Sequence, residues 1–180
     1  EFDVTVSSIP QATFDYLASL EWIRAAENYC AVGPAGTGKS HSLVAFGVAA
    51  VQAGHKVRYF TAADLVEALY RGLADNSVGR LIENLLKADL VIIDEVGFAP
   101  LDDTGAQLLF RFVAAACERR SLAIGSHWPF DKAHMFAATC ARRQLKYHGF
   151  GPAGGCRRRA GQKWVAIPNA CRSWAMSWRS

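Results

Sequence analysis

The glycine-rich segment GPAGTGKS at residues 33–40 constrains this chain more than any other feature, because it matches the pattern G-x-x-x-x-G-K-S at every position. A short apolar stretch, Tyr29–Val32, precedes it, and the periodicity of Ser40–Gln52 predicts an amphipathic helix after it. A strand, this loop and a helix in that order predict a phosphate-binding loop. A glycine-rich turn without a ligand is the alternative, and the agreement of the motif with both flanks argues against it.

The residue types in this segment suit phosphate chemistry. Gly36 and Gly38 let backbone N–H groups turn toward a phosphate, and the helix N-terminus adds about half a positive charge there. We expect Lys39 to neutralise the β- and γ-phosphates of ATP, and the Ser40 hydroxyl to ligate Mg²⁺. The residues expected to hold the nucleotide are Gly33, Pro34, Ala35, Gly36, Thr37, Gly38, Lys39, Ser40 and His41.

Two carboxylates follow a second apolar stretch, Leu90–Ile93, which is typical of a strand covered on both faces. In open α/β sheets, ligands bind at the carboxyl ends of the strands. We expect Asp94 to hold Mg²⁺ and Glu95 to orient and deprotonate an attacking water. The alternative is an acidic pair that is merely solvated at the end of a strand. The presence of a phosphate loop in the same chain argues against this alternative.

A histidine follows the last predicted strand, Ser121–Ser126. At this position His127 could touch the γ-phosphate or the attacking water, so we place it with Lys39 and Glu95 among the predicted catalytic residues. A loop histidine held only by hydrogen bonds is the alternative.

Helical and strand patterns alternate along the first 126 residues. Helices are predicted at 12–28, 40–52, 62–72, 77–87 and 104–120, and strands at 29–32, 56–60, 90–93 and 121–126. This alternation predicts a three-layer α/β P-loop NTPase with a parallel sheet. Lys39 and Asp94 are 55 residues apart, which leaves room for another strand between theirs and favours motor ATPases over GTPases and small-molecule kinases.

The net charge of +4 hides two compositions. Residues 1–132 carry 11 basic and 16 acidic residues, a net charge of −5, whereas residues 133–180 carry nine basic residues and no acidic one. We therefore expect an ATP-binding core at 1–132 and a basic, irregular tail at 133–180. A shifted reading frame, a DNA-binding tail and an unfamiliar folded extension are three explanations of the tail.

Further patterns concern the location of the protein. The longest apolar run, Leu43–Val51, is too short to span a bilayer, and no secretory signal is visible. The five cysteines form no CxxC pair, so we expect reduced thiols in a cytoplasmic protein. The chain begins at Glu1 with no methionine, which we interpret as a fragment.

Beyond these motifs, residues 2–131 resemble the IstB-type transposition helper ATPases of insertion sequences, a branch of the AAA+ superfamily that also contains the DnaC-type helicase loaders. The resemblance rests on IPQATFDYLASLEWIRAAEN, GPAGTGKS, YFTAADLVEALYRGLADNSVGRL, LVIIDEVGFAPLDDTGAQLLFRFV and AIGSHWPFD. It implies ATP binding, hydrolysis coupled to assembly of a homo-oligomer on DNA, and recruitment of a transposase. Lys39, Ser40, Asp94 and Glu95 carry over by motif, and His127 stands at the first sensor position, where many relatives have Asn.

The chain departs from this family in two ways. The N-terminal helical segment that relatives use for partner contacts is absent, and the Asp-Arg-Leu helix, fifth strand and Ser-Tyr-Arg cannot be located in residues 133–180. We therefore expect the sheet to lack the fifth strand, which in the family pairs beside the phosphate-loop strand. A nucleotide-binding remnant without turnover, a helicase loader and a small-molecule kinase stay open as alternative functions.

Overall fold

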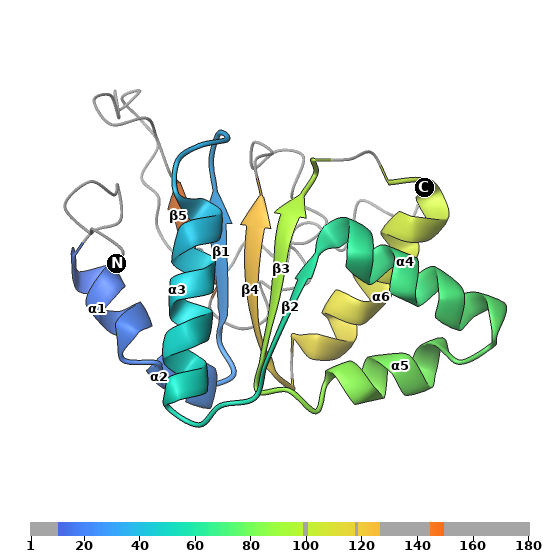
Figure 1. The fold of residues 1–180 in the computed structure, drawn as a ribbon, viewed down its shortest axis with the longest axis horizontal. Coiled ribbons are helices and arrows are strands. Elements are labelled where there is room, and N and C mark those ends of the chain that lie inside the picture. The colour runs from blue at the N-terminus through green and yellow to red at the C-terminus, as the bar shows by residue number, and fades with distance from the viewer. Residues whose placement is uncertain (1–10, 99–100, 118, 127–144, 150–180) are drawn as a thin grey trace, which may run out of the picture.

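The computed structural model describes residues 11–98, 101–117, 119–126 and 145–149 of the 180-residue chain. The elements in chain order are α1 (Gln11–Ala18), α2 (Glu21–Arg24), β1 (Asn28–Val32), α3 (Lys39–Gln52), β2 (Val57–Thr61), α4 (Ala62–Ala74), α5 (Val78–Leu85), β3 (Leu90–Val96), α6 (Asp103–Ala116), β4 (Ser121–Ser126) and β5 (Leu145–Gly149) (Figure 1). Within these described ranges, no helix has both the length and the apolar character needed to cross a membrane.

The five strands form one parallel sheet in the order β2-β3-β4-β1-β5 (Figure 1). Ala123 of β4 lies between Tyr29 of β1 and Ile92 of β3, so β4 separates the phosphate-loop strand from the acidic strand. This confirms the strand predicted between them from the spacing of Lys39 and Asp94. Because the strands are parallel, their carboxyl ends all lie at one edge, the upper edge in Figure 1.

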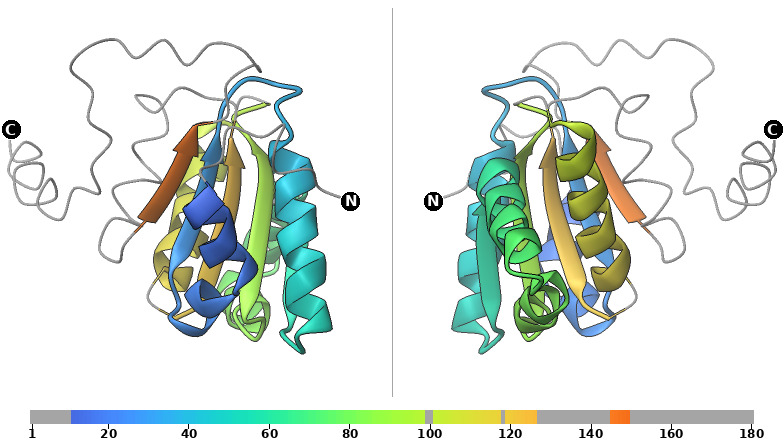
Figure 2. Two further views of the ribbon diagram at one scale, coloured as in Figure 1. Left: turned by 90° about the vertical axis from the view of Figure 1, so that its left-hand side faces the viewer. Right: turned by 90° about the vertical axis from the view of Figure 1, so that its right-hand side faces the viewer.

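The central strands are covered on both faces, and alternate residues enter different cores. On β3, Val91 and Ile93 pack in a cluster with α4, α5 and α6, whereas Leu90 and Ile92 pack in a second cluster with α1, α2 and α3. Figure 2 shows α3 and α6 on opposite sides of the sheet. The result is the predicted three-layer α/β fold, and the unbroken apolar run of β3 is explained by burial on two faces.

The amino-terminal helix prediction is wrong at its centre. The periodicity over 12–28 is real, but α1 ends at Ala18 and α2 begins at Glu21, because Leu20 between them has a left-handed backbone with φ 58°. The break lets both Leu20 and Trp22 be buried, and the Trp22 Nε1 donates to the carbonyl of Leu17 at 3.0 Å. Burial of these large side chains therefore outweighs the continuity of the helix.

The sequence predicts helix starts at residues 62 and 104, and the structure confirms the first and moves the second. The α4 helix begins at Ala62, and Thr61 caps it, since its Oγ1 accepts from the Asp64 backbone N–H at 3.1 Å. The α6 helix instead begins one residue before Thr104. Its cap is Asp102, whose Oδ1 accepts from the Gly105 N–H at 3.0 Å. A carboxylate is a stronger acceptor than a hydroxyl at this position, which explains the shift.

The expectation that the sheet lacks its fifth strand is wrong. β5 pairs with β1 along its whole length, from Asn28 opposite Leu145 to Val32 opposite Gly149. Without β5, the backbone groups on this side of β1 would form an open sheet edge, and pairing satisfies them. The composition of the tail and the missing family motifs carried no information about this local pairing. The remaining tail residues, 133–144 and 150–180, lie outside the described residues.

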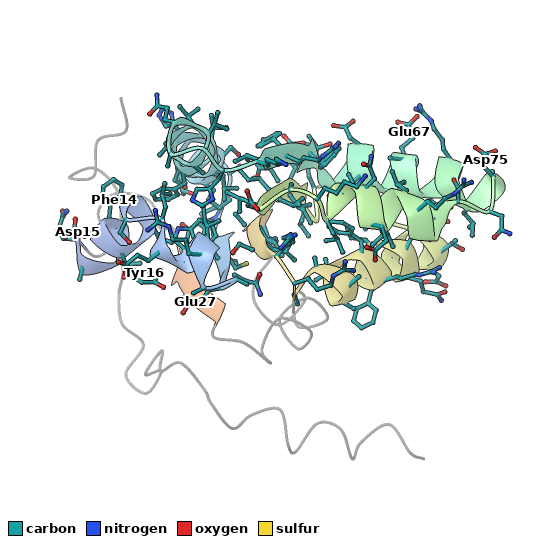
Figure 3. All side chains as sticks on the ribbon, turned by 90° about the horizontal axis from the view of Figure 1, so that it is seen from below. Phe14, Asp15, Tyr16, Glu27, Glu67 and Asp75 are labelled. Carbon is teal, nitrogen blue, oxygen red and sulfur yellow. The ribbon has the colours of Figure 1, made fainter. Side chains whose placement is uncertain are left out.

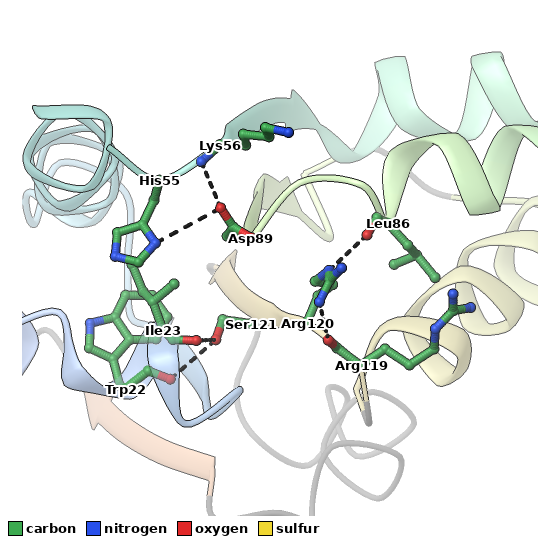
Figure 4. A network of polar contacts seen from close by, with 9 residues as sticks. All are labelled: Trp22, Ile23, His55, Lys56, Leu86, Asp89, Arg119, Arg120 and Ser121. Atoms are coloured by element: carbon green, nitrogen blue, oxygen red, sulfur yellow. Dashed lines mark hydrogen bonds and ion pairs between the residues drawn. The ribbon is translucent and has the colours of Figure 1, made fainter. Parts of the chain in front are cut away.

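Polar contacts join the elements at the amino ends of the strands, opposite the phosphate loop (Figure 4). The Lys56 backbone N–H before β2 donates to Asp89 Oδ2 before β3 at 2.9 Å, and Arg120 Nε donates to the carbonyl of Leu86 at 2.8 Å. Ser121 Oγ, at the start of β4, donates to a carbonyl of α2 at 3.2 Å. These bonds fix the register of β2, β3 and β4 at the edge that carries no candidate site.

Aromatic contacts hold α1 against the helix that follows the phosphate loop. The rings of Phe14 and Phe46 have centroids 5.8 Å apart, and those of Phe46 and Tyr29 are 6.0 Å apart in an edge-on arrangement. Tyr16 donates to Glu27 Oε2 at 2.7 Å (Figure 3). The amino-terminal helices thus fill the face of the sheet that α3 leaves open beside β1.

Two of the five cysteines, Cys30 and Cys117, lie in the described part of the chain, and both are buried. Burial raises the pKa of the Cys30 thiol to about 12, so it stays protonated at neutral pH. The other three, Cys140, Cys156 and Cys171, lie outside the described residues.

The two cap positions before α4 and α5 provide a test of the fold. We expect Thr61→Ala to lower the free energy of unfolding by about 1 kcal/mol, because it removes the acceptor for the Asp64 N–H. Ser77 precedes α5 without a side-chain cap bond, so Ser77→Ala should change it by less than about 0.5 kcal/mol. Urea denaturation measures both, and equal losses would contradict the assigned caps.

Candidate functional site

The phosphate loop joins the carboxyl end of β1 to the first turn of α3. The Gly33 N–H donates to the carbonyl of Ser126 at 3.1 Å, which ties the start of the loop to the end of β4. Gly36 and Gly38 have φ of 78° and 86°, values that favour glycine, and no side chain caps the α3 N-terminus after Gly38. The loop therefore presents backbone N–H groups and the positive end of a helix dipole, as the motif predicts.

Lys39 holds its charge inside this loop. Its Nζ donates to the carbonyl of Pro34 at 2.7 Å and lies 3.5 Å from Thr37 Oγ1, and the side chain is buried. Burial lowers the pKa of Lys39, and the negative charge of Asp94 opposes that change. The ammonium is thus desolvated and held within reach of any anion that the loop binds, while Ser40 and His41 beside it are exposed.

Asp94 is a buried carboxylate at the carboxyl end of β3, with 2% of its surface exposed. Its Oδ1 accepts from the Glu95 backbone N–H at 2.8 Å, and its Oδ2 accepts from the hydroxyl of Tyr59 at 3.0 Å. Asp94 shares a face of β3 with Ile92, which packs against α3, so its side chain lies on the side of the phosphate loop. These bonds stabilise an otherwise costly buried charge.

Glu95 differs from its neighbour in both exposure and backbone. It is exposed to solvent, and its φ is 59°, an unusual value for a residue other than glycine. The pairing of β3 with β4 shifts register between Ile93 and Val96, so Glu95 sits at a bulge that turns it away from the strand. One residue of the predicted pair is therefore fixed in the core, and the other is free to meet solvent.

Sequence reasoning missed Gly125, which makes room for Asp94. A Cβ atom at Gly125 of β4 would lie 2.1 Å from Asp94 Oδ1 and 2.8 Å from Leu43 Cδ1. Its backbone is not in the left-handed region, so glycine is required here by space and not by conformation. The signal in the sequence is a glycine inside a predicted strand, because such a glycine often marks a place where another group lies close to the backbone.

Sequence reasoning also missed Tyr59, whose hydroxyl contacts Asp94 from the edge strand β2. Burial and the hydrogen bond to Asp94 raise the pKa of Tyr59 to about 12, so the phenol is protonated and donates. A tyrosine in a strand is common, and no spacing rule pointed to this one. The last predicted site residue, His127, lies outside the described residues, directly after the end of β4.

The residues brought together fit a magnesium nucleotide. Mg²⁺ prefers oxygen ligands and is held by one or two carboxylates together with phosphate oxygens. The structure supplies one buried carboxylate, Asp94, with lone pairs beyond its two hydrogen bonds, and an exposed hydroxyl, Ser40, at the start of α3. The donor types and the uncapped helix N-terminus both suit this group.

The close contact between Gly125 and Asp94 gives a test. We expect Gly125→Ala to lower the free energy of unfolding by about 1–3 kcal/mol, because the new methyl group must displace the Asp94 carboxylate or Leu43. The control is Gly79→Ala in α5, where a Cβ meets nothing within 4 Å, and alanine should stabilise the helix by about 0.5–1 kcal/mol. Thermal denaturation compares them, and a neutral Gly125→Ala would contradict the packing described.

The left-handed backbone at Glu95 gives a second test. We expect Glu95→Gly to be more stable than Glu95→Val by about 1–2 kcal/mol, because a β-branched residue is strained at this φ and glycine is not. The side chain is exposed, so lost packing does not obscure the comparison. Chemical denaturation of the two variants measures the difference, and a valine variant equal to the glycine variant would show that the backbone is not left-handed in solution.

Solved structures similar to this one establish the fold. The replication initiator DnaA bound to AMPPCP and single-stranded DNA is similar over 77% of this chain and 47% of its own, with a TM-score of 0.61 and 19% identity. The DnaC helicase loader is similar over 77% of this chain and 91% of its own, with a TM-score of 0.56 and 15% identity. These likenesses, together with the parallel sheet between helix layers, confirm the predicted fold class.

Sequence relatives establish the family. A protein of insertion sequence IS21 from Pseudomonas aeruginosa, named for ATP binding, is 32% identical over 154 residues, which cover 82% of this chain and 58% of the relative. The corresponding protein of IS5376 from Geobacillus stearothermophilus is 32% identical over 132 residues, covering 73% and 53%. The chain thus spans little more than half the length of these relatives. A model of the family described as IstB-like ATP binding protein matches residues 1–140, and the chain therefore belongs to this family.

Proposed function

We propose that this chain binds ATP with Mg²⁺ at residues 33–41 and Asp94, hydrolyses the nucleotide with Glu95, and assists DNA transposition. The observation that carries the proposal is the placement of Lys39 and Asp94. Lys39 begins the helix after β1 and Asp94 lies in β3, and in the sheet only β4 separates these two strands. The negative charge of Asp94 also raises the pKa of Lys39, against the effect of burial. A cation and a buried carboxylate at the same edge of a parallel sheet suit a magnesium nucleotide.

ATP is the nucleotide that the comparisons favour. The matching family and its insertion-sequence members are named for ATP binding, and the similar DnaA structure holds the ATP analogue AMPPCP. The loop contributes backbone N–H groups, Lys39 contributes its charge, and Ser40 and Asp94 are the proposed magnesium ligands. The proposed nucleotide-binding unit spans residues 1–132, with β5 added to its sheet.

Hydrolysis is assigned to Glu95. Its side chain is exposed beside the buried Asp94, so it is free to accept a proton from water while Asp94 keeps its charge in place. Bound Mg²⁺ would neutralise charge on the phosphate oxygens. His127 follows the last residue of β4, and we propose that it contacts the γ-phosphate or the attacking water.

DNA and a transposase are the proposed partners, and a homo-oligomer in the cytoplasm is the proposed form. The relatives belong to insertion sequences, and the similar DnaA structure contains single-stranded DNA. These names support a role in moving DNA, which the nucleotide site would drive.

Two substitutions in the site separate binding from hydrolysis. We expect Lys39→Ala to weaken ATP binding more than about tenfold, because it removes the buried cation that faces the phosphates. Glu95→Gln should keep the affinity within about twofold and lower kcat by about 100-fold or more, since it removes the base and keeps the volume. Binding of a fluorescent ATP analogue and phosphate release measure the two effects, with Lys87→Ala as a control outside the site.

The outcomes distinguish the possible functions. ATP binding unaffected by Lys39→Ala would overturn the site itself. Binding without turnover in the unaltered chain would identify a nucleotide-binding remnant. Turnover that duplex DNA does not stimulate, with transfer of phosphate to a small acceptor, would point to a kinase and remove the proposed role in transposition.

A further inference from the structure

Tyr59 is a residue of the edge strand β2 that is nearly half exposed, and its hydroxyl is hydrogen-bonded to the most buried charge of the site. The side chain is 45% exposed, yet its oxygen lies 3.0 Å from Asp94 Oδ2. Neither cluster of buried residues includes Tyr59. The contact with Asp94 is the side-chain hydrogen bond that the structure gives Tyr59.

The register of the sheet brings the two groups together. β2 pairs with β3 so that Tyr59 lies opposite Ile92, and Thr61 lies opposite Asp94. Tyr59, Ile92 and Asp94 thus share one face of the sheet, with Asp94 on the diagonal from Tyr59, a spacing that a long side chain can bridge. Ile92 packs in the cluster that contains α3, so this is the face that carries the phosphate loop.

The Asp94 carboxylate is held at three points. The phenol of Tyr59 donates to Oδ2, the Glu95 N–H donates to Oδ1, and the bare backbone of Gly125 lies against Oδ1. An ionised carboxylate only accepts hydrogen bonds, so the phenol must be the donor. The amide and Gly125 both act on Oδ1, and among the described residues only Tyr59 donates to Oδ2. Without it, the carboxylate could rotate about its bond to Cβ and turn Oδ2 away.

We propose that Tyr59 is a positioning residue for magnesium, which holds the Asp94 carboxylate in the orientation that receives the ion of a bound magnesium nucleotide. This inference rests on the function proposed above and adds to it a residue outside the phosphate loop and the acidic pair. Partners that orient a metal-binding carboxylate commonly change metal affinity when they are removed, even though they do not touch the metal.

The test measures how nucleotide binding depends on magnesium. A fluorescent ATP analogue is titrated with the full chain in EDTA and over a range of MgCl₂ concentrations. Tyr59→Phe removes only the hydroxyl, so binding in EDTA should match the unaltered chain. The MgCl₂ concentration at half-maximal enhancement of binding should rise by about tenfold. This reading does not depend on ATP hydrolysis.

Tyr70→Phe is the matched control. Tyr70 on α4 also donates its phenol to an aspartate, Asp102, at the start of α6, away from the phosphate loop. Its substitution removes the same kind of bond, so it shows what the loss of a phenol–carboxylate contact does to the fold alone. We expect Tyr70→Phe to leave the magnesium dependence unchanged.

Each outcome decides between explanations. A Tyr59→Phe chain with unchanged magnesium dependence would overturn the proposal. So would a Tyr59→Phe chain that fails to fold while Tyr70→Phe folds, since Tyr59 would then be a structural residue. If the unaltered chain binds no nucleotide, or binds it equally well with and without magnesium, the proposed function fails first, and that result is seen before any variant is compared.

Discussion

The charge of a buried carboxylate must be stabilised by nearby groups, and for Asp94 these groups come from β2, from β3 and from the residues that follow β1. A charge with 2% exposure has lost most of its contact with water, which is unfavourable unless donors or opposite charges replace it. A phenol from β2, an amide from β3 and the Lys39 ammonium after β1 supply them. β4 supplies no group and only the space at Gly125. The strand order β2-β3-β4-β1 is what allows all four contributions at one place.

The same strand shows how the core and the site are kept apart. β3 is apolar as far as Ile93 because both of its faces are covered, and its polar residues begin where the strand leaves the cores. A regular strand would have placed Glu95 on the opposite face, among the buried residues beneath α4 and α6. The left-handed φ of Glu95 and the shifted register of β3 against β4 turn it to solvent instead. The strain at this residue thus keeps a second carboxylate out of the core.

Local patterns predicted most of this fold, and long-range contacts account for what they missed. The phosphate loop follows from a short segment whose residues are near one another in the chain, and the strand between β1 and β3 is predicted from the spacing of Lys39 and Asp94. Tyr59 lies 35 residues from Asp94, and Gly125 lies 31 residues from it, so only the assembled sheet shows that they touch. The break at Leu20 also depends on packing against other elements, and periodicity alone does not contain that information.

The fifth strand connects the unusual composition of the tail to the site. Composition separates residues 133–180 from the rest of the chain, yet five of them, Leu145–Gly149, complete the sheet beside β1. Pairing depends on backbone groups, which every residue except proline offers, so a change in charge and residue usage does not prevent it. With β4 on one side and β5 on the other, β1 is an interior strand. The phosphate loop therefore begins from a strand that is held on both sides, and its position relative to Asp94 does not depend on an exposed sheet edge.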